Sequence, residues 1–344
     1  MSYQAPSAIY IRKQDGQAFL DEIEVGRKEK PSPQAGEVLV RLLVRPVNPA
    51  DVLSMQGYYP GFQPASLPAI PGLEGYGKIE EIGSGVSGLS VGQRVVPILL
   101  NNYTKHGNGS WQDYIAVKQD DIIPIPDSIS DEHAAQFIVN PWTAIGLLKF
   151  LNIPKGEWLL QTGASSVLGR QIIALAKHLG IKTVNVVRRP DAEAELKALG
   201  ADAVIASTGD HSDLSAKVKQ VTGANGAYAA IDAVAGDIVK ALSESVRNNG
   251  LLVLYGGMSG AMESVFMHWE VALRKVNITG YWVTPDIAAM TPEQKRERAN
   301  EVIDLMNQRV ISPFSGEKFD LKDVKKAVQK SLEEKRGGKV LLVG

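Results

Sequence analysis

The amino-acid sequence contains no cysteine, and this absence excludes several kinds of chemistry. A chain of 344 residues without cysteine has no disulfide, no thiolate nucleophile, no iron–sulfur cluster and no zinc site that needs a cysteine ligand. Histidine is scarce too: there are five, and no two lie at the i,i+4 spacing that a helical metal site requires. The sequence therefore predicts no metal site.

Net charge is almost absent as well. The chain has 37 Lys and Arg against 38 Asp and Glu, so its formal net charge is -1, and it has no strong field to attract nucleic acid or an anionic membrane. No run approaches the roughly 18 apolar residues that cross a bilayer, and residues 1–6 lack the features of a signal peptide. We expect no nucleic-acid or membrane partner and a cytosolic location.

The length of the chain and its turn pattern predict two domains. The chain exceeds the size at which one hydrophobic core usually stops growing, and 44% of its residues are hydrophobic. Short strands separated by glycine and proline are expected at residues 38–44, 77–82 and 94–98. The final apolar run, 340–343, should pair with this β-rich domain. The predicted boundaries are residues 1–125 with 310–344 for the β-rich domain and 126–309 for the second domain.

The second domain shows strands alternating with helices. A buried strand at 157–162 leads through a loop of small residues into a helix that ends at Gly180, and another strand follows at 182–187. A helix from Thr291 to about Asn307 begins with the capping pair Thr291 and Gln294. Further strands are expected at 203–205, 229–232, 251–255 and 276–281. This alternation predicts an α/β fold with a doubly wound parallel sheet.

The loop after the first strand of this domain is suited to a dinucleotide. In such folds the pyrophosphate approaches the backbone N–H groups at the start of the following helix, which requires small residues there. The segment 164–169 (Ala-Ser-Ser-Val-Leu-Gly) supplies them but keeps only the last of the three glycines of the common fingerprint. A tight structural turn remains the alternative interpretation.

Two adjacent arginines follow the second strand of the same domain. Enzymes that use NAD carry an acid at this strand end, whereas enzymes that use NADP carry arginine, which grips the 2′-phosphate through charge-assisted hydrogen bonds. Here Val187 is followed by Arg188 and Arg189, and no acid stands at the strand end. The sequence therefore predicts NADPH as the cofactor, unless the pair is only a solvated surface charge.

Several short motifs together resemble the medium-chain dehydrogenase/reductase superfamily, in its quinone oxidoreductase and mitochondrial-type 2-enoyl thioester reductase branch. Zinc alcohol dehydrogenases of that superfamily carry a Gly-His-Glu ligand motif, but this chain has Leu73 in place of the histidine. The motifs that resemble the branch are Asn48-Pro49-Ala50-Asp51, Gln56-Gly57-Tyr58-Tyr59-Pro60, Gly109-Ser110-Trp111, Val139-Asn140-Pro141-Trp142-Thr143-Ala144, Tyr255-Gly256-Gly257-Met258-Ser259 and Gly280-Tyr281-Trp282-Val283-Thr284.

The resemblance implies a zinc-independent enzyme with a GroES-like catalytic domain and a Rossmann NADPH-binding domain. Tyr59 matches the position of the active-site tyrosine, and Asn48 in the same segment is implied to be catalytic. The residues that the resemblance places beside the cofactor are Asn140 and Thr143 at the nicotinamide or its ribose, Ser165, Ser166 and Val167 at the pyrophosphate, Arg188 and Arg189 at the 2′-phosphate, and Tyr255, Gly257, Met258, Trp282 and Lys339.

Three functions agree with these features. The first is an NADPH-dependent reductase that transfers hydride to the β-carbon of a trans-2-enoyl thioester, with the phenol of Tyr59 as donor to the enolate. The second is an NADPH:quinone oxidoreductase. The third is a non-catalytic NADPH-binding sensor on the same scaffold. We also expect a homodimer, because residues 276–279 resemble an exposed edge strand that can pair with its copy.

Overall fold

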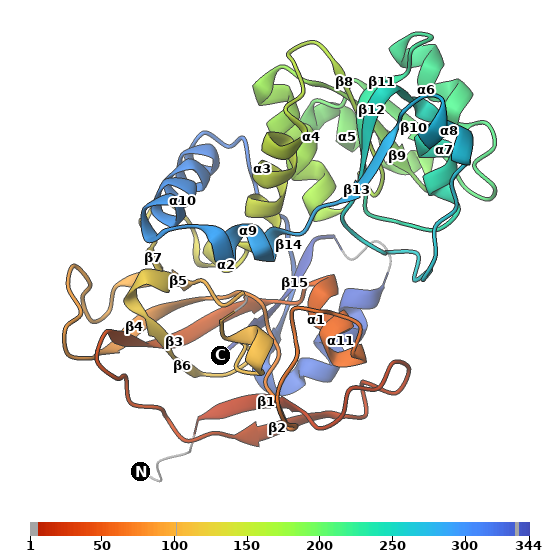
Figure 1. Ribbon diagram of the computed structural model, residues 1–344. Helices are drawn as coiled ribbons and strands as arrows, with labels where there is room; N and C mark the ends of the chain where they lie inside the picture. The colour runs from red at the N-terminus through yellow and green to blue at the C-terminus, as the bar shows by residue number, and fades with distance from the viewer. Residues whose placement is uncertain (1–5, 101, 334–336) are drawn as a thin grey trace. The chain divides into compact units, whose positions relative to one another are not determined.

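The structure, a computed structural model, describes residues 6–100, 102–333 and 337–344 and divides into two compact units (Figure 1). The first, the β-rich unit, combines Met1–Trp142 with Thr284–Gly344, and the second, the dinucleotide unit, is Thr143–Val283. Each unit is described by itself below. Two helices cross the boundaries between them, α3 (Val139–Leu151) and α9 (Val283–Ala289).

The β-rich unit is built mainly of short strands from both ends of the chain. Its strands are β1 (Ser7–Ile11), β2 (Ile23–Arg27), β3 (Glu37–Pro46), β4 (Tyr76–Ile82), β5 (Arg94–Pro97), β6 (Tyr114–Lys118), β7 (Ile122–Pro124), β14 (Ser315–Asp320) and β15 (Lys339–Val343). Its α-helices are α1 (Pro49–Gln56), α2 (Asp131–Ala135), α10 (Pro292–Asn307) and α11 (Val324–Leu332). The strands expected in the first third of the sequence are thus confirmed as β3, β4 and β5.

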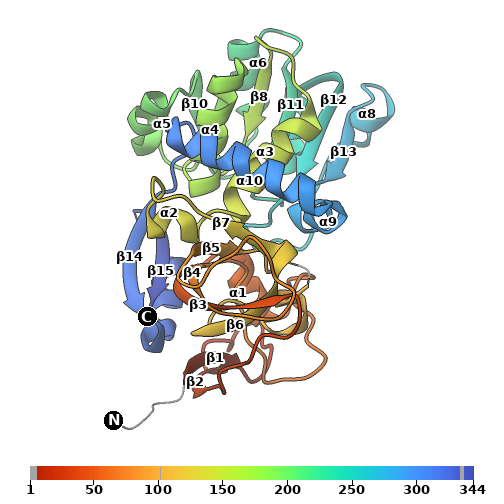
Figure 2. The same cartoon turned by 90° about the vertical axis from the view of Figure 1, so that its left-hand side faces the viewer.

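The end of the chain returns to the first half of the β-rich unit, as the sequence predicts. Strand β15 pairs antiparallel with β3, with Leu341 opposite Pro46 and Val343 opposite Val44. The seven-stranded sheet has the order β14-β15-β3-β4-β5-β7, and β6 also pairs with β3. Figure 2 shows β14 beside β15, a parallel pair that the sequence did not reveal because β14 reads Ser-Gly-Glu-Lys-Phe-Asp, with little apolar pattern. The pairing places Lys339 next to the end of β3.

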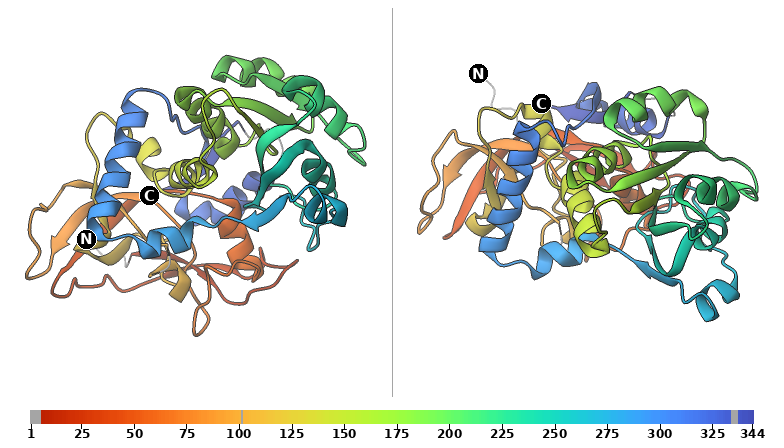
Figure 3. Two further views of the ribbon diagram at one scale, coloured as in Figure 1. Left: turned by 45° about the horizontal axis from the view of Figure 1, so that its top comes forward. Right: turned by 90° about the horizontal axis from the view of Figure 1, so that it is seen from above.

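The dinucleotide unit is a doubly wound parallel sheet. Its strands are β8 (Trp158–Gln161), β9 (Lys182–Val187), β10 (Ala203–Ala206), β11 (Ala227–Asp232), β12 (Val246–Leu254) and β13 (Asn277–Gly280), and all five pairings are parallel. The spatial order β10-β9-β8-β11-β12-β13 is the 3-2-1-4-5-6 order of a Rossmann sheet. The helices α4 (Val167–Leu179), α5 (Glu193–Leu199), α6 (Leu214–Thr222) and α7 (Ile238–Ser245) flank the sheet (Figures 1 and 3). The predicted α/β fold class is confirmed.

The units divide the chain at other positions than the boundaries expected from the sequence, 125/126 and 309/310. Helix α10, expected from Thr291 to about Asn307, forms with its predicted capping pair but belongs to the β-rich unit. Its Lys295 donates to the buried carboxylate of Asp121 over 2.6 Å, and Arg298 lies over the ring of Trp142. These contacts join residues far apart in sequence, which a linear pattern does not reveal. The sequence also predicts a helix from Asp320 that ends at Gly337 and Gly338, with Lys335 and Arg336 in its last turn. Helix α11 forms in this segment, and residues 334–336 lie outside the described residues.

Candidate functional site

The loop between β8 and α4 has the geometry that its small residues predict. Gly163 turns the chain with a φ of +60°, and the Ser166 hydroxyl caps α4 by accepting from the Gly169 N–H over 3.0 Å. A Cβ on Gly169 would lie 2.6 Å from the carbonyl oxygen of Gly163, so only glycine allows the loop to cross the first turn of the helix this closely. This loop presents Ser165, Ser166 and Val167 at the helix start.

The predicted cofactor residues of the dinucleotide unit gather at one edge of its sheet. The loop 165–167 follows β8, Arg188 and Arg189 follow β9, and Tyr255 to Met258 follow β12. Since all these strands are parallel, their carboxyl ends share an edge, and ligands of open α/β sheets bind at that edge. Gly163 and Met258 are close, because a Cβ on Gly163 would lie 3.7 Å from the Met258 sulfur. Trp282, which follows β13, is 39% exposed.

A buried carboxylate that the sequence did not single out holds this edge together. Asp232 ends β11 with no exposed surface, and it accepts from the Thr162 hydroxyl over 2.5 Å and from the N–H groups of Val234 and Ala235. The Thr162 oxygen in turn accepts from the Ala233 N–H over 2.9 Å. This hydrogen-bond network joins the loop after β8 to the loop after β11 and holds both loops in place at the carboxyl edge of the sheet. The sequence does contain a signal for this residue, because Asp232 is an acid at the end of an otherwise apolar strand.

Tyr255 has an unsatisfied polar atom at the same edge. Its hydroxyl is buried and has no hydrogen-bond partner among the described residues, although its N–H donates to the Asp232 carbonyl oxygen over 2.9 Å. Burial, with a smaller contribution from the Asp232 charge, raises the pKa of this phenol, so it stays protonated at neutral pH. Buried hydroxyls usually find a partner. Together with the open space above Gly257, this hydroxyl fits an edge that accepts a polar ligand.

The two arginines are exposed at the tip of β9. Arg189 forms an ion pair with Asp191 at 3.6 Å, and the carboxylate is half-exposed. Exposed ion pairs contribute little, at most about 1 kcal/mol, so a phosphate can compete for this guanidinium. Next to them, Ser207 at the end of β10 donates its N–H to the Val187 carbonyl oxygen. The tip of β9 therefore offers two adjacent cations to an anion.

In the β-rich unit, the structure joins two predicted site residues that are distant in the sequence. The buried Lys339 donates from Nζ to Asn48 Oδ1 over 2.7 Å. The Asn48 amide nitrogen donates to Glu74 Oε1 over 3.1 Å, and Glu74 Oε2 accepts from the N–H groups of Ile138 and Val139. We call these three side chains the Lys-Asn-Glu chain. Lys339, Asn48 and Glu74 are at most 3% exposed, so the hydrogen bonds lie in a low-dielectric interior.

A second buried carboxylate lies beside the Lys-Asn-Glu chain. Asp51 accepts from the N–H groups of Asn48 (2.7 Å) and Leu73 (3.0 Å) and has no exposed surface. Burial raises the pKa of Asp51 to about 7; the two backbone donors and the Lys339 charge oppose this shift, while the Glu74 charge adds to it. Burial also raises the pKa of Glu74. The sequence predicted neither acid as a site residue, although both lie within motifs that it singled out.

Tyr59 lies just beyond α1 and differs from its neighbour Tyr58. The Tyr59 ring packs over Gly61, where a Cβ would lie 2.4 Å from the ring, and the side chain is partly buried. Tyr58 is 58% exposed, and its hydroxyl packs against Gly16 instead. Asn140 and Thr143 lie one turn apart on α3, and both are buried. The structure therefore separates the environments of two tyrosines that are adjacent in the sequence.

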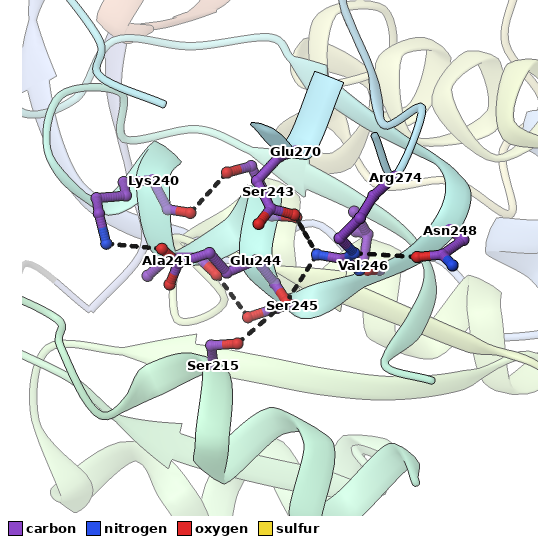
Figure 4. Close-up of polar contacts among 10 residues, drawn as sticks. All are labelled: Ser215, Lys240, Ala241, Ser243, Glu244, Ser245, Val246, Asn248, Glu270 and Arg274. Atoms are coloured by element: carbon purple, nitrogen blue, oxygen red, sulfur yellow. Dashed lines mark hydrogen bonds and ion pairs between the residues drawn. The ribbon is translucent and has the colours of Figure 1, made fainter. Parts of the chain in front are cut away.

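A hollow of about 690 Å³ lies elsewhere in the dinucleotide unit. Its lining includes Lys219 on α6 and, further along the chain, Arg247, Asn248, Trp269 and Arg274. Figure 4 shows Arg274 donating to Glu270, to Asn248 and to the Val246 carbonyl oxygen. These residues belong to the amino-terminal part of β12 and to α8 (His268–Ala272) with the turn after it. The hollow therefore lies away from the carboxyl edge, where cofactors bind in such sheets.

In the part of the chain that the structure describes, no group of three or more His, Cys, Asp or Glu residues is arranged to hold a metal ion. Across the same described ranges, no helix is both long enough and apolar enough to span a bilayer.

Comparison with known proteins assigns family descriptions to both parts of the chain. Residues 34–127 match the family described as "Alcohol dehydrogenase GroES-like domain", and residues 167–307 match the family described as "Zinc-binding dehydrogenase". The mitochondrial enoyl-[acyl-carrier-protein] reductase of Caenorhabditis elegans is 35% identical over 309 residues, which cover 88% of this chain and 85% of that protein.

Two solved structures share the fold over nearly the whole chain. A Bacillus thuringiensis protein assigned as an NADPH:quinone reductase has a TM-score of 0.88 and 31% identity, with 99% of this chain and 100% of that chain covered. The Escherichia coli quinone oxidoreductase in complex with NADPH has a TM-score of 0.86 and 25% identity, with 98% of this chain and 100% of that chain covered.

Proposed function

Because the chain belongs to the quinone oxidoreductase and enoyl reductase branch of the medium-chain dehydrogenase/reductase superfamily, we propose that it uses NADPH to reduce the double bond of a trans-2-enoyl thioester. Members of this branch are oxidoreductases by name. The observation that carries the choice of cofactor is the exposed pair Arg188 and Arg189 at the tip of β9. The choice of an enoyl thioester as hydride acceptor is supported by the relatives named as enoyl reductases, which match most of the chain.

The residues at the carboxyl edge of the dinucleotide unit fit the parts of NADPH. The loop 165–167 would face the pyrophosphate, and Arg188 and Arg189 would bind the 2′-phosphate by charge-assisted hydrogen bonds. Tyr255, whose hydroxyl has no hydrogen-bond partner within the described ranges, would line the remaining surface together with Gly257, Met258 and Trp282. In the β-rich unit, Asn140 and Lys339 are proposed to face the nicotinamide half, as is Thr143 on α3. The bound cofactor would supply a hydride.

The protein side chains would stabilise the charge that develops on the substrate. Addition of hydride to the β-carbon leaves an enolate, whose oxygen needs a hydrogen-bond donor and whose α-carbon needs a proton. We assign the hydrogen-bond donor to the enolate oxygen to Tyr59, because a phenol O–H can donate to an oxyanion without a metal. Asn48 and the buried ammonium of Lys339 provide a fixed polar group in the same unit.

A quinone is the second candidate acceptor. The Bacillus thuringiensis and Escherichia coli structures are named as quinone reductases, and they match the chain over nearly all of its length. Both candidate reactions use the same cofactor and differ in the oxidant. An enoyl thioester requires a donor for its enolate, whereas a flat quinone requires mainly an apolar slot. Tyr59 therefore matters more for the first reaction than for the second.

The experiment measures NADPH oxidation by the purified protein with a trans-2-enoyl-CoA and with a simple benzoquinone. We expect the enoyl-CoA to be reduced, and Tyr59→Phe to lower kcat for it by about 10²-fold, since loss of one hydrogen-bond donor to a developing oxyanion typically costs 10²- to 10³-fold. Tyr58→Phe is the matched control and should keep full activity, because Tyr58 is exposed. Full activity of Tyr59→Phe removes Tyr59 from the mechanism. NADPH binding without turnover of either acceptor would favour the sensor hypothesis.

We also propose that the protein forms a homodimer through β13. This strand is the last in the sheet order, pairs only with β12 among the described strands, and is mostly exposed. The preceding segment, 258–273, carries exposed large apolar side chains, with Met262 85% and Leu273 71% exposed. Such a patch beside an unpaired edge is typical of an interface. Light scattering should give the mass of a dimer for the wild type and of a monomer for Thr279→Lys, since Thr279 is exposed on this strand; a wild-type monomer would contradict this proposal.

The cellular location stays a prediction. The relatives named as enoyl-[acyl-carrier-protein] reductases carry the word mitochondrial in their names. The cytosolic location expected from the sequence is not tested by the structure.

A further inference from the structure

We propose that Glu74 is a positioning residue of the reductase: its carboxylate fixes the Asn48 amide, and the amide fixes the ammonium of Lys339. This inference rests on the proposed function, since it names how the polar group of that site is held. It concerns residues of the β-rich unit alone, and Glu74 itself need not touch substrate or cofactor.

The hydrogen bonds of Asn48 allow only one orientation of its amide. Oδ1 accepts from the Lys339 ammonium, and Nδ2 donates to the Glu74 carboxylate. A rotation of the amide by 180° would place its NH₂ group against the ammonium and its oxygen against the carboxylate. Both contacts would then be repulsive, and in a buried site an unpaired polar group costs about 1–3 kcal/mol. The orientation of Asn48 therefore depends on having a cation on one side and an anion on the other.

Glu74 is itself held in place by backbone donors. Its second oxygen accepts from the N–H groups of Ile138 (3.0 Å) and Val139 (2.8 Å), at the start of α3. Those N–H groups have no partner within a helix, and a helix start favours negative charge. Both Glu74 oxygens thus act as acceptors, as an ionised carboxylate does, and the helix that carries Asn140 is tied to the same group. A single carboxylate therefore orients Asn48 and anchors the start of α3.

The arrangement predicts what an isosteric change at Glu74 does. In Glu74→Gln, the new amide must turn its NH₂ group either toward the Asn48 NH₂ group or toward the two backbone N–H groups. Either choice brings donors face to face. Turning toward Asn48 opposes one donor group, whereas turning toward α3 opposes two, so the new NH₂ group turns toward Asn48. The Asn48 amide then loses its fixed orientation, and the Lys339 ammonium loses a fixed acceptor. A displacement of about 1 Å in a reacting group can cost about 10²-fold in rate. The loss should therefore appear in kcat more than in KM.

A compensating double variant tests the same logic in the opposite direction. Asn48→Asp alone places a carboxylate against Glu74 and should be strongly impaired. When it is combined with Glu74→Gln, the new carboxylate at position 48 can accept from Lys339 and from the NH₂ group of the new amide at position 74, while the oxygen of that amide accepts from α3. All donors and acceptors are then paired again, with the negative charge moved to the neighbouring side chain. A residue that merely filled space at position 74 would show no such recovery.

The kinetic experiment uses the full-length wild type, both single variants, the double variant and Asp121→Asn. Asp121 is a buried carboxylate of the same unit that pairs with Lys295, so its variant controls for general destabilisation. With a trans-2-enoyl-CoA, we expect Glu74→Gln to lower kcat about 10- to 100-fold with KM for NADPH changed less than about threefold. The double variant should exceed either single variant about tenfold, and Asp121→Asn should keep its kcat. Full kcat in Glu74→Gln, or no recovery in the double variant, overturns the proposal.

A second measurement does not depend on activity. Reductive methylation followed by mass spectrometry reports the access and the protonation of each lysine. We expect Lys339 to be protected in the wild type and to react several-fold faster in Glu74→Gln, because the ammonium loses its held partner and a nearby negative charge. Equal reaction rates contradict the positioning role. If the wild type reduces no enoyl thioester or quinone, the proposed function fails, and the methylation rates alone still decide whether Glu74 positions Lys339.

Discussion

Replacement of the two arginines after β9 should reduce the preference for NADPH over NADH. A hydrogen bond to a charged group contributes about 1.5–3 kcal/mol, and exposed sites lie at the low end of this range. Arg188 and Arg189 should therefore each contribute about 1.5 kcal/mol to binding of the 2′-phosphate.

These free energies convert directly to affinities, since 1.4 kcal/mol is a tenfold change in Kd. Arg188→Ala and Arg189→Ala should each weaken NADPH binding about tenfold, and the double variant about 100-fold. NADH lacks the 2′-phosphate, so its Kd should change by less than about twofold in every variant. The wild-type preference for NADPH should also shrink as salt is added, because the guanidinium groups are exposed.

Isothermal titration calorimetry with both cofactors measures these four proteins under identical conditions. Lys240→Ala is a suitable control, since Lys240 is an exposed cation of the same unit that pairs with Glu244 on α7. It should leave both affinities unchanged. The reasoning is refuted if the double variant binds NADPH as tightly as the wild type, or if it loses affinity for NADH to the same degree. In the second case the arginines would support the fold of the loop rather than recognise the phosphate.

Two further substitutions test how the fold is held together. Arg45→Met should lower the free energy of unfolding by about 3–5 kcal/mol. The reason is that the fully buried guanidinium donates to the carbonyl oxygens of Leu42, Ser110, Gln112 and Gly344. Urea denaturation followed by tryptophan fluorescence measures the effect, and an unchanged midpoint would contradict this. Gly169→Val should cost about 1–3 kcal/mol and weaken NADPH binding, because its side chain would clash with the Gly163 carbonyl group; calorimetry and thermal unfolding check both effects.

The sequence predicted the features that depend on local pattern. The order of the elements in the dinucleotide unit follows from its short apolar strands and from the glycines that end its helices. Because the sheet is parallel, the carboxyl ends of these strands lie at one edge. Residues 165–167, Arg188 and Tyr255 were therefore placed correctly at strand ends without any coordinates. Whether they bind the cofactor stays a prediction.

The features that the sequence could not predict depend on contacts between distant residues. Lys339 and Asn48 are separated by 291 positions, and only the pairing of β15 with β3 brings them together. Glu74 follows Leu73, the residue that replaces the zinc-ligand histidine. No periodic pattern in the sequence predicts the hydrogen bond between Glu74 and Asn48. Helix α10 was expected in the dinucleotide domain because its own pattern says nothing of Asp121, to which it is joined. Polar contacts of this kind are specified by the assembled fold and not by the order of residues.

The buried carboxyl of Asp51 should make the stability of the β-rich unit depend on pH. Its pKa is about 7 in the folded protein and about 3.9 in an unfolded chain, so the folded state binds more protons between these values. Since stability falls with rising pH wherever the folded state holds more protons, this group contributes its full stabilisation below about pH 4. The contribution declines through the interval up to about pH 7 and changes no further above it, with a total of about 4 kcal/mol at most.

Asp51→Asn removes this titration and leaves that of Glu74, whose pKa burial also raises, in both proteins. The difference in unfolding free energy between wild type and variant should therefore shift toward the variant as the pH rises from about 4 to 7, whatever the variant's stability at one pH. Urea denaturation at a series of pH values measures that difference. Two parallel stability curves would mean that Asp51 is ionised throughout, and that its two backbone donors outweigh the cost of burial.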